Sequence, residues 1–163
     1  MERKINRRLT SDENALEGMP LQMLIISLIL AIGLPLVYSS LRHHDTQTVL
    51  RRAEEQAESI NEKAKQLHAY GEGNSDVISI DLEDGIFSEI KFLELGNKSF
   101  RNLIRWEIRE GKKGMLLLED HLSLISDEPI KLGSGSHELN MECKFGEVQG
   151  TEGEMLYIKV SKL

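Results

Sequence analysis

Residues 19–41 of this chain form an uncharged apolar stretch. Its 23 residues include no Asp, Glu, Lys, Arg or His, and twelve of them are Leu, Ile or Val. A helix of about 20 such residues crosses the roughly 30 Å hydrocarbon layer of a bilayer. At about −0.5 kcal/mol each, the branched residues favour insertion by roughly 6 kcal/mol. Since a buried helix of a soluble protein is rarely apolar on every face for this length, the stretch predicts a transmembrane helix.

The segment before this helix, residues 1–18, is short, polar and balanced in charge, with four basic and four acidic side chains. A secretory signal has an apolar run of 7–15 residues that ends in a small-residue cleavage site. Here the run is longer and continues directly into Arg42. Basic residues favour the cytoplasmic side, and four precede the helix while only Arg42 closely follows it. We therefore expect a single-pass protein with its N-terminus in the cytoplasm and the rest outside.

After residue 41 the chain becomes charged but keeps a helical period. Apolar or small side chains recur at steps of four and three residues, at Thr46, Leu50, Ala53, Ala57, Ile60, Ala64 and Leu67. Residues 42–70 are therefore predicted to continue the helix as an amphipathic segment that ends before the glycines of residues 71–74. The stripe has two interpretations. It packs on the chain's own globular domain, or, together with Ala31 and Gly33, it packs against the helices of other subunits. Within the apolar part, Pro35 predicts a kink.

Residues 71–163 change to a period of two. Apolar residues alternate with polar ones around Ile78, Trp106, Met141 and Ile158, and glycine-rich turns separate six or seven such runs. This pattern predicts an antiparallel β-sandwich-like head domain, so the fold class is α+β. The only cysteine, Cys143, lies on an apolar stripe and is expected to be a core residue, so no intrachain disulfide forms.

The sequence of this head domain indicates no reactive site. It carries 11 Lys and Arg against 18 Asp and Glu, which accounts for the whole net charge of −7 and argues against nucleic acid as a partner. No spacing indicates catalytic, cofactor-binding or metal-binding residues, since His43 and His44 are adjacent on a helix and their rings diverge. We expect no enzymatic activity and no cofactor. Asn97 begins an Asn-Lys-Ser tripeptide, a possible N-glycosylation site at a predicted turn.

Taken together, the order of segments resembles that of a type IV pilin-like protein, in particular the archaeal ones with a class III signal peptide. The resemblance rests on Gly18-Met19-Pro20-Leu21 at the junction of leader and helix, on Tyr-Gly-Glu-Gly-Asn at the helix end before Val-Ile-Ser-Ile-Asp-Leu, and on Gly-Ser-His-Glu-Leu over residues 135–139. It covers the whole chain in architecture, but only about the first 85 residues by motif. Two positions depart from the pattern. Glu17 stands where many archaeal leaders have Lys or Arg, and Met23 stands where many bacterial pilins have Glu.

The resemblance implies that residues 1–18 are a leader and that a prepilin peptidase cuts between Gly18 and Met19 on the cytoplasmic side. The chain is then held by membrane lipid before it assembles with identical or related pilin subunits. In the resulting cell-surface filament, the helices bundle in the core and the head domains lie outside. We interpret the chain as a major or minor structural subunit of such a filament. The alternative is a single-span, membrane-anchored β-sandwich module that binds a surface-layer component or an archaellum-type motor component.

Overall fold

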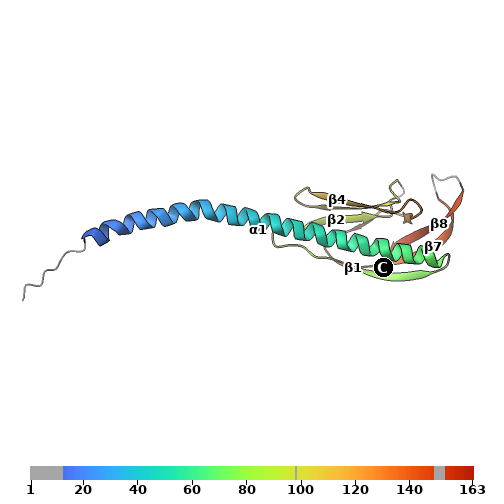
Figure 1. Ribbon diagram of the computed structural model, residues 1–163. Coiled ribbons are helices and arrows are strands. Elements are labelled where there is room, and N and C mark those ends of the chain that lie inside the picture. The colour runs from blue at the N-terminus through green and yellow to red at the C-terminus, as the bar shows by residue number, and fades with distance from the viewer. Residues whose placement is uncertain (1–12, 98, 149–152) are drawn as a thin grey trace, which may run out of the picture. The chain divides into compact units, whose positions relative to one another are not determined.

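The computed structural model describes residues 13–97, 99–148 and 153–163 (Figure 1). Contacts within the chain divide it into two compact parts, Met1–Leu41 and Arg42–Leu163. The division falls at the predicted boundary between residues 41 and 42, and it groups residues 42–70 with the strands. The α+β fold class expected from the sequence is confirmed, with one long helix followed by two mainly antiparallel sheets.

The helix α1 spans Glu13–Tyr70 and ends at the predicted residue. Gly71 terminates it in the left-handed conformation (φ +86°), and its N–H donates to the carbonyl of Leu67 at 3.2 Å. At the other end α1 starts inside the predicted leader, since residues 13–18 are helical, while residues 1–12 lie outside the described part of the chain. The helix continues through Pro35 without interruption, so the kink there stays a prediction.

Eight strands form two four-stranded sheets in the described residues. The first sheet has the order β1-β7-β8-β5 and the second has the order β4-β3-β2-β6. Their bounds are β1 Ser75–Leu82, β2 Ile90–Leu95, β3 Leu103–Ile108, β4 Lys113–Leu117, β5 Leu124–Ile125, β6 Ile130–Leu132, β7 Gly135–Glu147 and β8 Glu154–Lys162. The longest pairings join β7 to β1 and to β8, and β7 and β8 are the two inner strands of this sheet.

Three details of the strands differ from the sequence prediction. The described part contains eight strands instead of six or seven. The short strand β5 runs parallel to β8, whereas every other pairing is antiparallel. Residues 86–95 are also rich in apolar side chains and are expected from the sequence to form one strand, but the strand begins only at Ile90, because residues 86–89 form a loop that bonds to α1.

The core of the Arg42–Leu163 part combines one face of the helix with the inner faces of both sheets. In Figure 1 this half of α1 runs along the strands, with β2 and β4 on one side of it and β1 on the other. The largest fully buried side chains of this core are Ile60, Ile80, Leu82, Leu93, Leu95, Ile104, Ile108, Leu118, Leu122, Leu124, Leu132 and Leu139. Cys143 is also buried, as expected for a core cysteine. Helix and sheets therefore share one hydrophobic core.

Candidate functional site: an exposed apolar helix segment

Residues 20–41 of α1 expose nearly all of their side chains. The large apolar side chains of this segment are between 47% (Ile25) and 72% (Met23) exposed. A soluble monomer rarely exposes a contiguous apolar patch of more than a few hundred Å². By length and composition, α1 is the one helix in the described residues that could cross a membrane. The segment therefore needs an apolar environment from outside the chain.

Within this segment, the hydroxyl of Ser27 is bonded to the helix itself. The Ser27 hydroxyl donates to the backbone carbonyl of Met23, a bond that hides a hydroxyl from an apolar environment. Gly33 leaves a gap on the helix surface, since a Cβ placed there would meet no side chain, and no backbone beyond its own stretch of helix, within 4 Å. Both Gly33 and the exposed Ala31 would let another helix approach closely. Their role in packing between helices remains a prediction.

The rest of the predicted helix-bundle stripe has a different role. Ala53, Ala57, Ile60 and Ala64 are 0% exposed and Leu67 is 3% exposed, all within the chain's own core. Their assignment to contacts between subunits is wrong, and of the two interpretations the structure shows packing on the chain's own domain. The physical reason is that steps of three and four residues mark one face of a helix whether a sheet or another helix covers it. Leu50 is only partly buried, and Val49 takes the core position beside it.

Polar contacts join α1 to the loop before β2, at the start of the part of the helix that packs on the sheets. The N–H groups of Ile86 and Phe87 donate to the two carboxylate oxygens of Asp45 at 2.8 and 2.9 Å. The hydroxyls of Thr46 and Ser88 are 2.8 Å apart and buried. These backbone N–H groups favour the charged carboxylate and lower the pKa of Asp45 below its ordinary value of 3.8.

A glycine makes this contact possible. A Cβ added at Gly85 would overlap the carboxylate of Asp45, so the loop can reach the helix only without a side chain at this position. In the sequence, the Asp-Gly pair at residues 84–85 is a turn signal, but the sequence does not indicate the contact with Asp45. An Asp-Gly pair indicates a local turn, but it carries no information about a contact with a residue some 40 positions away.

Ion pairs add further links between helix and strands. Arg52 pairs with Glu83 at 2.8 Å, and Lys63 pairs with Asp76 at 2.7 Å. Lys65 pairs with Glu119 at 3.0 Å, in the segment after β4. Each pair is partly solvated and is worth little alone.

Replacing Asp45 with asparagine is expected to lower the stability of the β domain at neutral pH. It should also make that stability fall less as the pH is lowered. Because the folded-state pKa of Asp45 is lowered, its contribution is present above about pH 3.8 and is lost as the pH falls through the folded-state value. Urea unfolding of the full chain in detergent, followed by Trp106 fluorescence at pH 7 and near pH 3, measures this effect. The difference in free energy of unfolding between wild type and Asp45→Asn should be smaller at the lower pH. A constant difference would contradict the assignment, and Asp120→Asn, at an exposed carboxylate, is the matched control.

The predicted glycosylation site lies beside a buried carboxylate. The side-chain amide of Asn97 donates to Glu94 at 3.0 Å, and Arg105 donates to the same carboxylate at 2.8 Å. Burial alone would raise the pKa of Glu94, but these hydrogen bonds and the positive charges of Arg105 and Lys131 lower it overall. Lys98 lies outside the described residues, so half-buried Asn97 stays only a possible acceptor.

The remaining sequence candidates do not come together into a reactive site. Burial raises the pKa of the Cys143 thiol, which makes it a poor nucleophile. His43 and His44 are both exposed. Within the described ranges, no three His, Cys, Asp or Glu side chains are placed to hold a metal ion. A pocket of about 180 Å³ is lined by Arg101, Ile125, Ser126, Asp127, Glu147, Val148 and Tyr157.

The predicted cleavage point between Gly18 and Met19 lies within the helical part of the chain. The structure therefore assigns their backbone conformation, and processing between them stays a prediction. Comparison of the chain with protein families, with curated proteins and with solved structures finds no match.

Proposed function

We propose that this chain is a structural subunit, major or minor, of an archaeal type IV pilus-like surface filament. The observation that carries the proposal is that an exposed apolar segment, residues 20–41, belongs to the same helix as a segment that packs on a folded β domain. Before assembly the segment would lie in membrane lipid. After assembly it would be covered by the same segments of neighbouring subunits.

The separation of roles along the helix supports this proposal. Residues 46–67 bury their apolar stripe within the chain, so the β domain is complete without another subunit. Along the described part of α1, the exposed large apolar side chains before Tyr70 all lie in residues 20–41, so contacts between helices would be confined to this segment. A single head-to-tail contact that repeats without closing produces a helical filament, and Ala31 and Gly33 supply small residues for such a contact.

Removal of residues 1–18 would permit the change from lipid to filament. The leader is polar and balanced in charge, with four basic and four acidic groups that would otherwise enter an apolar helix bundle. Cleavage before Met19 would leave residues 19–41, which contain none of these charges. The prepilin peptidase that this implies is a proposed partner, carried only by the resemblance at residues 18–21.

Replacing Gly18 with phenylalanine is expected to block processing, because a peptidase pocket shaped around glycine has no room for a bulky side chain. The precursor should then accumulate in the membrane fraction, as measured by intact mass. Glu17→Lys is the matched control, since it brings the junction closer to the leaders that this one resembles. It should be processed at least as fast as the wild type. Normal cleavage of the Gly18→Phe variant would contradict the proposed junction.

A further inference from the structure

The loop before β2 carries an apolar side chain with no partner in the described residues. Ile86 is 86% exposed, more than any other large apolar side chain that the structure describes. Flexible loops can hide such a residue, but this loop is held by the bonds from Ile86 and Phe87 to Asp45. Gly85 also donates to the carbonyl of Ser88 at 2.8 Å. Ile86 is therefore displayed from a fixed backbone.

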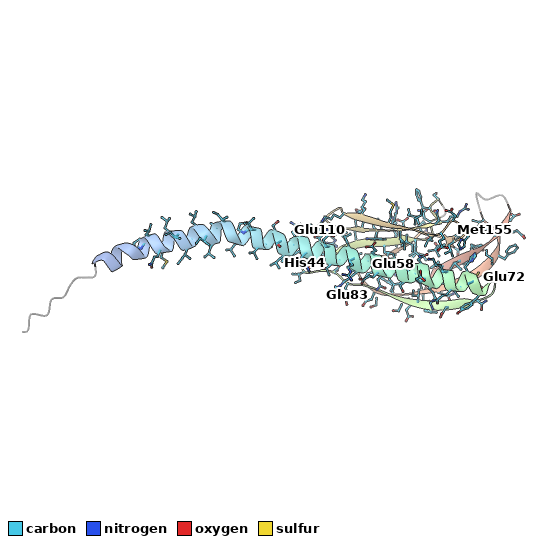
Figure 2. The ribbon with its side chains drawn as sticks, in the orientation of Figure 1. His44, Glu58, Glu72, Glu83, Glu110 and Met155 are labelled. Carbon is cyan, nitrogen blue, oxygen red and sulfur yellow. The ribbon has the colours of Figure 1, made fainter. Side chains whose placement is uncertain are left out.

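The loop before β2 bonds to α1 close to the end of the uncharged stretch. Asp45, to which the loop bonds, follows the end of the uncharged stretch by four residues, a rise of about 6 Å along a helix. The headgroup layer on each side of a bilayer is about 5–7 Å thick. Figure 2 shows Glu83 and Glu110 at the end of the β domain where His44 lies. The segment before β2 and the segment after β3 therefore both lie at the end of the β domain near His44.

The charges around the loop permit contact with lipid. Glu83 pairs with Arg52, and Glu89 pairs with Arg109 at 2.7 Å, so neither is a bare negative charge. Asp84 accepts the N–H of Ile90 at 2.8 Å, and Asp45 accepts two N–H groups. On the helix side Arg42, His43 and His44 are exposed, the polar and basic residue types that suit a headgroup layer.

We propose that residues 85–87 rest in the headgroup layer while the chain is held in a membrane, with Ile86 inserted among the lipids. The partner is thus a lipid surface, and the loop acts as a second contact beside the transmembrane segment. An apolar side chain at this depth replaces water with the boundary of the acyl chains. The inference rests on membrane insertion of residues 20–41 but not on filament assembly. In a filament, the same side chain would have to leave the lipid.

The test uses single cysteines in the full chain, labelled with an environment-sensitive dye. Cys143 can stay in place, because it is buried and its thiol pKa is raised. One chain per phosphatidylcholine nanodisc excludes burial of Ile86 by a second copy. The probes are Ile86→Cys, Tyr70→Cys and Leu30→Cys. Tyr70 is 72% exposed and lies 25 residues after Asp45 on α1, a rise of about 37 Å.

Brominated lipids should quench the dye at residue 86 several-fold more than the dye at residue 70. Quenching at residue 30 shows separately that the apolar segment is in the bilayer. Quenching at residue 30 with equal, weak quenching at residues 86 and 70 would overturn the inference and leave the proposed function intact. Absence of quenching at residue 30 would contradict membrane insertion itself, and the inference would fail with it.

Discussion

Replacing Gly33 with leucine is expected to abolish filaments while the protein remains stably inserted in the membrane. The side chain meets nothing within the chain, since a Cβ at Gly33 has open space around it. Leucine also favours membrane insertion by about 0.5 kcal/mol and a helical backbone by roughly 1 kcal/mol relative to glycine. The substitution therefore costs nothing in the free subunit. In a bundle it would hold neighbouring helices apart at the point of closest approach.

Two measurements distinguish an effect on membrane insertion from an effect on filament assembly. The amount of protein in the membrane fraction should equal that of wild type, and fibres in the sheared surface fraction should disappear. Gly33→Ala is the matched control, because alanine is also small and should preserve assembly. Wild-type yields of fibres from Gly33→Leu would show that the small residue is not at a contact between subunits.

The second large effect concerns the docked half of the helix. Replacing Ile60 with alanine is expected to destabilise the β domain by about 2–5 kcal/mol, the range for removing a fully buried branched side chain. Ile60 is 0% exposed and belongs to the core shared by α1 and both sheets. Its loss would leave a cavity between helix and strands. Urea unfolding of the full chain in detergent, followed by Trp106 fluorescence, measures this change.

The adjacent residue provides a matched control. Ser59 is exposed on the same turn, and Ser59→Ala should change the free energy of unfolding by less than about 0.5 kcal/mol. If Ile60 contributed mainly to contacts between subunits, Ile60→Ala would leave the isolated subunit as stable as Ser59→Ala does. Equal stability of the two variants would therefore contradict the structural assignment of the stripe.

Local signals in the sequence predicted the elements well. The end of α1 at Tyr70 follows from Gly71 and Gly73, both of which have positive φ angles in the structure. Strands β1, β3 and β7 follow from strict alternation of apolar and polar residues, which matches their burial patterns. Such signals depend on a few neighbouring residues, so they can be interpreted without knowledge of the fold.

Features that depend on distant partners were not predictable in this way. The heptad stripe of residues 46–67 specifies an apolar face but not its occupant, and the structure assigns that face to the chain's own sheets. Ile86 and Phe87 have strand-forming side chains, but their N–H groups bond to Asp45 instead of to a strand. The two-residue strand β5 pairs in parallel with β8, and so short a run carries no signal of direction.

In the proposed filament, residues 19–41 leave lipid to join the same segments of sister subunits. The most direct test is electron microscopy of the sheared cell-surface fraction, with mass-spectrometric sequencing of the N-terminus of this chain in the same fraction. We expect thin fibres that contain the chain, beginning at Met19. Recovery of the chain only from the membrane fraction, with an intact Met1 terminus and no fibres, would exclude filament assembly and favour a permanently anchored module.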